Sequence, residues 1–249
     1  MKKVTIVMLT YNAEKYVEHS IRTIKKYTES NSQSYRYRLL VCDNASDNRT
    51  RKKLNSLKLK GYIDKLVFFE QNYYFVGGNN RAMDYVPDDT DYILLLNSDI
   101  EIRNSHWLRG LLDVHRRGIT ACQVCCETDC RPDGWCLLVD KDIFEKYKLD
   151  EKRFTWWFSI ADFGSRVMKD GYSVQSIRNY KNFIRHFGGA SEIECSVEKS
   201  GCEYAVDVDK WYPQKCDVIE TLELNGGKKH YDVFFELFNA INRFIRKIM

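Results

Sequence analysis

The sequence predicts an α/β protein with a Rossmann-like, mostly parallel sheet flanked by helices. Two patterns carry this prediction. Apolar runs alternate with helical stretches through the first half of the chain, and the runs are nearly continuous, as is typical of strands buried on both faces. The composition agrees, because 44% of the residues are hydrophobic and only 3 are Pro, which favours a packed core over a disordered chain.

Four strands and three helices are expected in the first half. The strands are expected at residues 4–9, 38–42, 66–69 and 92–96, and the helices between them at residues 14–27, 50–59 and 79–85. This alternating order implies strands that run in parallel, with helices covering both faces of the sheet.

The second half is less regular. A strand is predicted at residues 134–139, a short helix at 140–147, and a helix at 162–171 that Gly171 would cap. From residue 231 the pattern predicts an amphipathic helix, which either docks on the main domain or binds a membrane interface. Its apolar stripe consists of Phe234, Leu237, Phe238, Ile241, Phe244, Ile245 and Ile248, beside Arg243, Arg246 and Lys247.

Charge and cysteine content limit the partners and the compartment. The formal charge of +4 arises from 39 basic and 35 acidic residues spread along the chain, which does not indicate a nucleic-acid partner. It suits a cleft for a phosphorylated small molecule, or weak attraction to anionic lipid. The first apolar run is too short for a signal peptide, and no run reaches the roughly 20 apolar residues of a membrane span. Nine cysteines without a secretory signal favour reduced thiols and a cytoplasmic protein, at the membrane surface if the last helix binds lipid.

Polar residues gather where the predicted strands end. They are Thr10-Tyr11-Asn12, Asp43-Asn44-Ala45-Ser46, Asn72 and Asn97-Ser98-Asp99. Each group taken alone also suits an ordinary turn or helix cap. Because ligands of open α/β sheets bind beyond the carboxyl ends of the strands, four polar strand ends together favour one shared crevice. A carboxylate such as Asp99 at a strand end can hold Mg²⁺ or Mn²⁺ while the phosphates of a ligand supply further oxygens.

The ordered series of motifs resembles the inverting family 2 glycosyltransferases of the GT-A fold, especially their rhamnosyltransferase-like branch. The resemblance covers roughly the first 190 residues, and the order of the motifs is more specific than any one of them. The matching segments are 7–12, 41–47, Asn72, 75–80, 94–99, 133–139, Ala161-Asp162 ahead of Arg166 and Gly171, and 186–191.

The resemblance implies contacts to a nucleotide sugar. Base and ribose contacts fall on Thr10, Asn12, Asp43 and Asn44; Asn72, Gly78 and Asn80 would border the nucleotide pocket; Asn97 and Ser98 would face the donor. The segment 97–99 matches the metal-binding Asp-x-Asp motif of the family with Asn in place of the first Asp. Asp99 would then be the main carboxylate on a Mn²⁺ or Mg²⁺ ion, and Glu101 would either supplement the site or face solvent.

Two residues of the second half complete the implied machinery. Asp162 matches the general base of the family, with Ala161 where a Glu usually precedes it, and His186 matches a late histidine that binds metal or diphosphate. The alternatives are a carboxylate that stabilises a helix N-terminus and a packed histidine. The catalytic interpretation requires Asp99, Asp162 and His186 to converge on one cleft.

Aromatic and cysteine residues near these motifs allow two interpretations each. Trp156 and Trp157 suit either an acceptor platform or core packing. Four of the nine cysteines are spaced as zinc ligands can be, but the strand-like alternation over residues 119–126 favours buried thiols instead. They are Cys122, Cys125, Cys126 and Cys130.

Taken together, these patterns predict a GT-A domain over residues 1–200 and a C-terminal extension over 201–249. The expected reaction is metal-dependent, inverting transfer of a hexose or deoxyhexose from a UDP- or dTDP-sugar to a hydroxyl of a glycan or glycolipid. A catalytically weak, nucleotide-sugar-binding scaffold of a glycan-assembly complex is the alternative, since Asn97 replaces the first Asp of the metal motif and Ala161 stands where a Glu usually precedes the base. A nucleotidyltransferase is disfavoured, because no Gly-rich phosphate loop follows the first strand.

Overall fold

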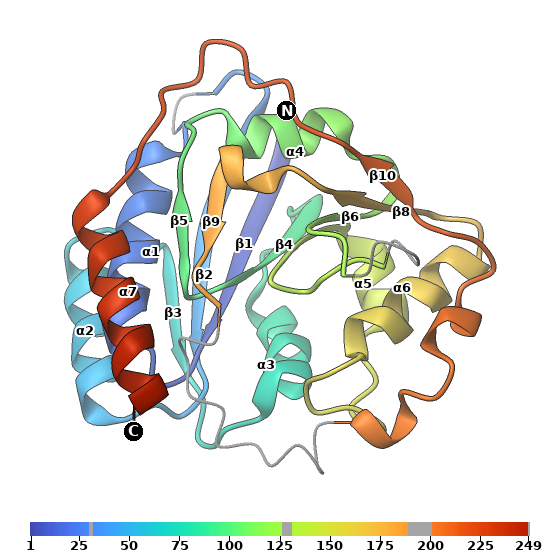
Figure 1. The fold of residues 1–249 in the computed structure, drawn as a ribbon, viewed down its shortest axis with the longest axis horizontal. Coiled ribbons are helices and arrows are strands. Elements are labelled where there is room, and N and C mark those ends of the chain that lie inside the picture. Colours follow the sequence, from blue (N-terminus) through green and yellow to red (C-terminus); the bar gives the residue numbers. More distant parts are fainter. Residues whose placement is uncertain (30–31, 126–130, 189–200, 249) are drawn as a thin grey trace.

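The computed structural model describes residues 1–29, 32–125, 131–188 and 201–248, with side chains described up to residue 242. It confirms the predicted class: a central sheet of eight strands lies between two layers of helices (Figure 1). The strand order is β10-β8-β6-β7-β4-β1-β2-β3. All neighbours pair in parallel except β7, which runs antiparallel to both β4 and β6.

The five predicted strands are present, with their ends shifted by up to three residues from the predicted positions. The strand bounds are β1 Lys2–Thr10, β2 Tyr35–Asp43, β3 Lys65–Phe68, β4 Tyr92–Asn97, β5 Ile100–Ile102, β6 Gly118–Cys122, β7 Cys136–Asp140, β8 Ser173–Ile177, β9 Ile184–His186 and β10 Asp217–Ile219. The two strands outside the main sheet, β5 and β9, pair antiparallel with each other. At three residues each, they are too short for an alternating pattern to reveal them in the sequence.

The helices separate into two layers that bury different faces of the sheet. Their bounds are α1 Glu14–Tyr27, α2 Asn48–Leu59, α3 Tyr74–Ala82, α4 Trp107–Val114, α5 Lys141–Tyr147, α6 Ser159–Lys169 and α7 Val233–Ile248. Apolar residues of α1, α2 and α4 form one core cluster with one face of β1 and β4, and those of α3, α5 and α6 form a second cluster with the opposite face. The sheet is therefore buried on both sides, which accounts for its continuous apolar strands.

The strand ends that the sequence marked as polar do lie along one edge of the sheet. Thr10 pairs with Asp43 at the ends of β1 and β2, and Leu9 pairs with Asn97 at the end of β4. Because β7 is antiparallel, its beginning lies at this same edge, and the Asn97 amide donates to the Trp135 carbonyl at 2.8 Å. The loop that leads into β7 is thus brought beside the end of β4.

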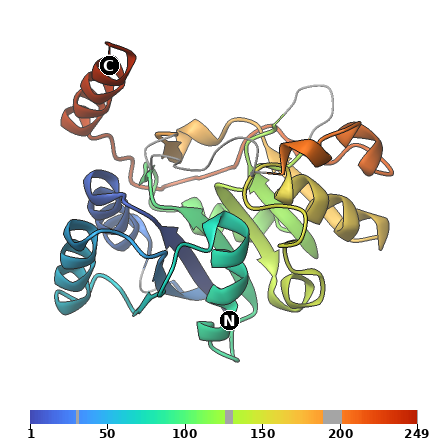
Figure 2. The ribbon, with the colours of Figure 1, turned by 90° about the horizontal axis from the view of Figure 1, so that it is seen from below.

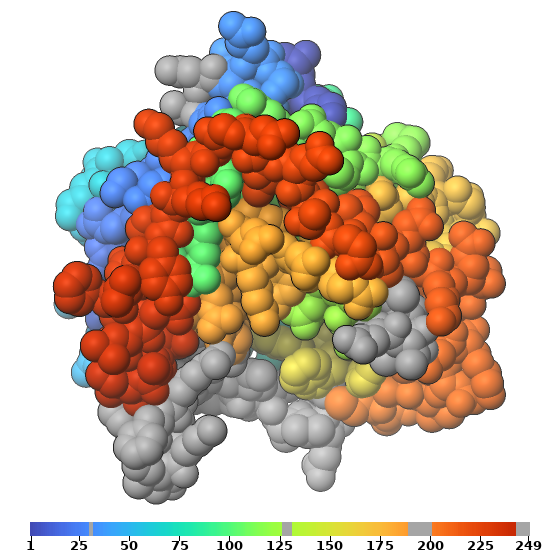
Figure 3. All heavy atoms as spheres, turned by 45° about the horizontal axis from the view of Figure 1, so that its top comes forward, coloured from blue at the N-terminus to red at the C-terminus, as the bar shows by residue number. Residues whose placement is uncertain are grey.

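Residues 201–248 run along the surface of the fold. Strand β10 adds to the sheet beside β8, and the segment after it crosses the surface to α7, which lies over α1 (Figures 1 and 3). Seen from below, α7 projects from the body of the domain (Figure 2). Within the part of the chain that the structure describes, no helix is both long and apolar enough to cross a membrane.

Helix α7 presents two apolar faces where the sequence pattern predicted a single stripe. Phe235 and Phe238 pack with Tyr16 of α1 and with Phe187, and the Tyr16 hydroxyl donates to Asn239 at 2.9 Å. Four other apolar side chains of α7 point away from the domain. The exposed fractions are 87% for Phe234, 63% for Val233, 60% for Leu237 and 50% for Ile241. The side chains of Phe244, Ile245 and Ile248 lie outside the described residues.

Candidate active site

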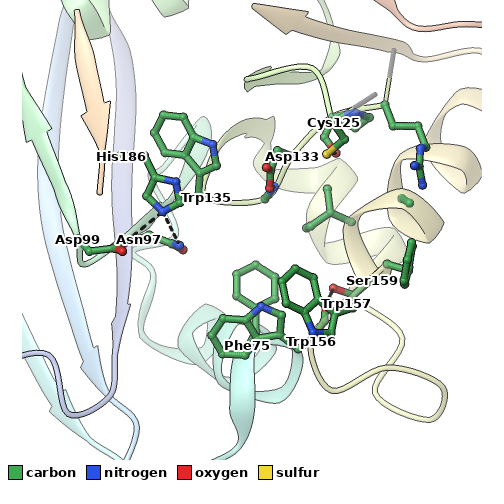
Figure 4. A pocket seen from close by; sticks show the side chains of 16 residues that line it. Phe75, Asn97, Asp99, Cys125, Asp133, Trp135, Trp156, Trp157, Ser159 and His186 are labelled. Atoms are coloured by element: carbon green, nitrogen blue, oxygen red, sulfur yellow. Dashed lines mark hydrogen bonds and ion pairs between the residues drawn. The ribbon is translucent and has the colours of Figure 1, made fainter. Parts of the chain in front are cut away.

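A pocket of about 320 Å³ opens beside the end of β4 and the beginning of β7 (Figure 4). This volume is within the range of small-molecule binding sites in proteins. Its wall combines a few polar groups with many aromatic ones. The lining residues are Phe75, Asn97, Asp99, Cys125, Arg131, Pro132, Asp133, Gly134, Trp135, Trp156, Trp157, Phe158, Ser159, Ile160, Ala161 and His186.

Asp99 and His186 meet at one side of this pocket although 87 positions separate them in the chain. His186 Nε2 lies 3.3 Å from Asp99 Oδ1 and 3.4 Å from Asn97 Nδ2 (Figure 4). Asp99 is 3% exposed. A carboxylate, an imidazole and an amide thus share one corner of the cavity, in which the low dielectric strengthens their interaction with a charged ligand.

The β5–β9 pair and Trp135 hold His186 in this place. Ile100 pairs with His186 across the two strands, and the Phe187 amide donates to the Asp99 carbonyl at 2.9 Å. The Trp135 indole stacks on the imidazole with ring centroids 4.6 Å apart and planes 9° apart. Backbone pairing sets the position of the ring and stacking sets its plane, so the imidazole is oriented before any ligand arrives.

The donor set of this corner fits a divalent cation such as Mn²⁺ or Mg²⁺. Carboxylate oxygens suit both ions, and imidazole nitrogen suits Mn²⁺-like metals. Among the described residues, no three His, Cys, Asp or Glu side chains cluster closely enough to hold a metal by themselves. A cation bound by Asp99 and His186 would therefore take further oxygens from its ligand, as a diphosphate can provide.

Two buried polar atoms without partners mark the neighbouring strand ends. Within the described residues, neither Thr10 Oγ1 nor Asp43 Oδ1 has a hydrogen-bond partner, although Thr10 is 2% exposed and Asp43 is fully buried. The other carboxylate oxygen of Asp43 accepts from the Ser46 amide and from Arg51 Nε, each at 3.1 Å. Burial raises the pKa of Asp43, although these hydrogen bonds act to lower it. Unpaired buried polar atoms are costly, so a ligand that brought donors to these two atoms would relieve that cost.

The expected nucleotide contacts Asn12, Asn44 and Asn72 are engaged in holding loops together. The Asn12 side chain accepts from the Asp47 amide at 2.9 Å. Asn44 donates to Asn72 Oδ1 at 2.7 Å and accepts from the Tyr73 amide at 2.9 Å. These bonds join the loops after β1, β2 and β3, so the three amides shape this edge of the sheet.

Gly78 and Asn80 of α3 have structural partners as well. A Cβ at Gly78 would come within 2.6 Å of Leu9, so glycine allows α3 to pack closely on β1. The Asn80 amide donates to the Leu149 carbonyl and to Glu151, both at 2.8 Å, and accepts from the Leu149 amide at 3.0 Å. Neither residue lines the pocket.

Glu101 neither supplements the metal corner nor faces solvent, contrary to both expectations. It is fully buried between His19 and Arg103, each 2.9 Å away. Burial acts to raise the pKa of this carboxyl, but the two hydrogen bonds outweigh it and hold the pKa below its usual range. Its function is to join β5 to α1, and through Arg103, which also pairs with Glu236, to α7.

Asp162 lies in α6 and has two arginine partners. Its carboxylate pairs with Arg166 at 2.8 Å and with Arg153, and the side chain is 7% exposed. Ser159, Ile160 and Ala161 line the pocket, whereas Asp162 does not. Of the three side chains expected to converge, the structure brings Asp99 and His186 into contact and engages Asp162 elsewhere.

The remaining expected residues divide in the same way. Ser98 is buried outside the pocket lining, and its carbonyl accepts from Ser20 at 2.8 Å. Trp156 and Trp157 both line the pocket, and Trp157 is 44% exposed. Cys125 also lines it, while Cys122 is buried in the core. Cys126 and Cys130 lie outside the described residues.

Asp133 is the pocket residue that the motifs identified without suggesting a role. It belongs to the segment 133–135, and only the antiparallel direction of β7 shows that this segment meets the end of β4. Phe75 was likewise part of a motif and lies 5.7 Å from the Trp156 ring. No pattern local to either residue predicts these contacts.

Comparison with known proteins places the chain in a class of fold and then in a family. Its fold matches that of GT-A glycosyltransferases. The profile of glycosyl transferase family 2 matches residues 5–170, and the chain belongs to this family. No curated protein sequence matches the chain.

Three solved structures illustrate the likeness, each at low sequence identity. The mannosyltransferase PcManGT from Pyrobaculum calidifontis, solved with GDP-Man and Mn²⁺, has a TM-score of 0.58 at 12% identity, covering 70% of this chain and 54% of that one. S. aureus TarS gives 0.57 at 14% identity, with 74% and 36% covered. GalNAc-T7, solved with UDP, GalNAc and Mn²⁺, gives 0.57 at 11% identity, with 69% and 41% covered. The chain thus spans about half or less of these proteins.

Proposed function

We propose that this protein transfers a sugar from a nucleotide-diphosphate donor to a hydroxyl acceptor, with inversion at the anomeric carbon. The observation that carries the proposal is the corner formed by Asp99 and His186, 3.3 Å apart at one side of an aromatic pocket. Membership of glycosyl transferase family 2 supports the reaction class. The rhamnosyltransferase-like branch stays a prediction.

The donor would lie across the edge of the sheet from β2 to β4. Its nucleoside would meet the unpaired Thr10 and Asp43 atoms, within a rim built by Asn12, Asn44 and Asn72. Its diphosphate would reach Asn97, Asp99 and His186. A divalent cation held by Asp99 and His186 would neutralise negative charge on the departing diphosphate.

For the donor we propose a UDP- or dTDP-linked hexose or deoxyhexose. A carboxylate such as Asp43 can accept the imide N–H that uracil and thymine share, and its second oxygen has no other partner among the described residues. PcManGT was solved with GDP-Man and GalNAc-T7 with UDP, so guanosine donors belong in any test.

The acceptor we propose is a glycan or a lipid-linked saccharide. Trp156, Trp157 and Phe75 give the pocket an aromatic side, and Trp157 remains nearly half exposed. Flat aromatic surfaces bind the apolar faces of sugar rings. The family resemblance assigns proton removal from the acceptor to Asp162; this remains a prediction, which Asp162→Asn tests below.

Peripheral contact with a membrane is the proposed function of the outer face of α7. The side chains of Val233, Phe234, Leu237 and Ile241 are each at least half exposed, while the opposite face of the helix packs on α1. The remaining sequence of α7 contains Arg243, Arg246 and Lys247, which suits anionic lipid. Such an anchor would hold the enzyme near lipid-linked acceptors.

Thermal-shift measurements test the donor proposal. The melting temperature is measured with UDP, dTDP and GDP, each with and without Mn²⁺. At least one of these nucleotides should raise it more in the presence of Mn²⁺, since a ligand bound to the native state stabilises it. Release of that nucleotide from its sugar conjugate then separates the enzyme from a binding scaffold, which would bind the conjugate without turnover. A protein indifferent to all three nucleotides contradicts the proposal.

A further inference from the structure

Asp133 is a carboxylate of the pocket that has no assigned function. It lies three residues before β7 and lines the same cavity as Asp99 and His186 (Figure 4). One of its oxygens, Oδ1, accepts from the Gly134 amide at 2.6 Å. The backbone N–H of Asn97 donates to the carbonyl of Trp135, which lies two residues after Asp133. This bond fixes the segment against the end of β4.

Close packing on the other side completes the placement of Asp133. A Cβ at Gly134 would come within 2.6 Å of Ile160 and 3.2 Å of Phe75. Glycine at this position therefore lets the segment approach the beginning of α6 and the helix α3. The carboxylate is held between these elements at the wall of the cavity, and a rigid support of this kind favours a reacting group.

The surroundings of Asp133 suit proton uptake. Burial raises the pKa of its carboxyl, while the Gly134 amide and the charge of His186 act in the opposite direction. A raised pKa makes a carboxylate a stronger base, as general-base catalysis requires.

The surroundings of Asp162 suit an ion pair instead. Arg153 and Arg166 both bind its carboxylate, and Asp162 is absent from the pocket lining. Charge-assisted bonds to two guanidinium groups stabilise the anion and occupy its lone pairs. A proton acceptor needs a lone pair directed at the substrate, so this arrangement disfavours Asp162 in that role.

We propose that Asp133 is the general base of the transfer reaction. This inference rests on the proposed function and names the residue that accepts the proton. The acceptor oxygen attacks the anomeric carbon of the donor and forms the new C–O bond as its proton passes to Asp133. The bond from the anomeric carbon to the phosphate oxygen breaks, and its electron pair leaves with the nucleoside diphosphate. The proton is later released from Asp133 to solvent.

Asp133→Asn and Asp162→Asn form a matched pair of variants that tests this proposal. Each exchange keeps the size of the side chain and removes its charge. The assay is nucleotide release from the UDP-, dTDP- or GDP-hexose that the wild type hydrolyses fastest in the presence of Mn²⁺, with water as acceptor. Thermal shift with the matching nucleoside diphosphate reports donor binding in every variant.

Asp133→Asn should lower the hydrolysis rate by about 100-fold or more while keeping the nucleotide-induced thermal shift. Asp162→Asn should keep a larger share of the rate in its folded fraction. The proposal is overturned if Asp133→Asn hydrolyses the donor at the wild-type rate. It is also overturned if folded Asp162→Asn loses more of the wild-type rate than Asp133→Asn does.

Two further outcomes keep the test decisive. If Asp133→Asn folds but loses the thermal shift, Asp133→Glu is compared with it: a rate at least about tenfold higher in the Glu variant supports a base, and equal rates overturn it. A wild type that neither binds nor hydrolyses any of the donors refutes the proposed function itself. A wild type that hydrolyses donor beside an equally active Asp133→Asn refutes only the role of Asp133.

Discussion

Two parts of the sheet edge contain similar polar residues that are used differently. Beyond β1, β2 and β3, the asparagine side chains bond mainly to one another and to loop backbone. Beyond the end of β4 and ahead of the beginning of β7, Asp99, Asp133 and His186 face a cavity with aromatic walls. The first region is a brace that holds these loops together, and the second lines the pocket of the proposed active site. Residue type does not distinguish them, because the partners of a side chain decide whether it remains available to a ligand.

Thr10 and Asp43 are exceptions within the brace, since each retains a buried oxygen without a partner among the described residues. We therefore expect the brace to bind a nucleoside at a single point, through groups that its own network leaves unused. Substitutions can separate three kinds of residue: those that line the pocket, those that only hold the loops together, and those, such as Asp43, that also keep an oxygen without a partner among the described residues.

The largest effect is expected from Asp99→Ala. The exchange removes the carboxylate of the proposed metal corner, and loss of electrostatic stabilisation at a reacting group typically lowers turnover by about 100- to 1,000-fold. The Mn²⁺-dependent part of the nucleotide-induced thermal shift should disappear as well. Donor hydrolysis and thermal shift measure the two effects. A variant that keeps its response to Mn²⁺ would place the metal elsewhere.

Asp162→Asn should mainly affect stability. It leaves Arg153 and Arg166 without their anionic partner, and because both guanidinium groups are partly exposed we expect a loss of about 2 kcal/mol in the free energy of unfolding. Urea denaturation measures this loss. Unchanged stability together with abolished turnover would return Asp162 to the role of the base.

Asp43→Asn should weaken nucleotide binding by about tenfold, as expected when one hydrogen bond to a charged group is lost. Stability should not fall with it, because burial raises the pKa of Asp43 and therefore disfavours its charged form in the native state. The linkage has a defined sign: this carboxyl opposes folding as pH rises through its native pKa, and the Asn variant lacks that term. Titration of the nucleotide across pH, with stability followed in parallel, checks both.

Asn80→Ala is the matched control for that variant within the same region. It removes three hydrogen bonds to residues 149 and 151, so the free energy of unfolding should fall by about 1 kcal/mol while nucleotide affinity stays unchanged. An affinity loss equal to that of Asp43→Asn would show that Asn80 contacts the ligand after all.

The smallest effect on stability is expected on the outer face of α7, where the same contrast between engaged and available side chains recurs. Phe234→Ser should change the free energy of unfolding by less than about 0.5 kcal/mol but reduce binding to anionic phospholipid vesicles. Phe235→Ala, on the packed face, should cost about 2 kcal/mol. Vesicle sedimentation that does not respond to Phe234→Ser would argue against membrane contact.

The sequence was sufficient for the fold class and for the edge at which polar residues gather. Continuous apolar runs defined strands β1, β2 and β4, and polar residues followed them at Thr10, Asp43 and Asn97. The meeting of Asp99 with His186 followed from the order of family motifs. The sequence could not predict the β5–β9 pair that produces the contact, because three-residue strands leave no periodic signal.

The roles of individual side chains were harder to predict from the sequence, with one exception. Asp162 and Arg166 are four residues apart on a helix, a spacing that itself predicts an ion pair, so the engagement of Asp162 could have been anticipated. The place of Asp133 depends on the antiparallel direction of β7, and the division of α7 into two faces depends on where α1 lies. Both are tertiary facts that no local pattern contains.

A crystal structure of the protein with Mn²⁺ and the nucleoside diphosphate that stabilises it most would show whether the donor binds at the proposed site. We expect the diphosphate and the cation at Asp99 and His186, with the base of the nucleotide against Thr10 and Asp43. A nucleotide bound away from the corner formed by Asp99 and His186 would contradict this expectation.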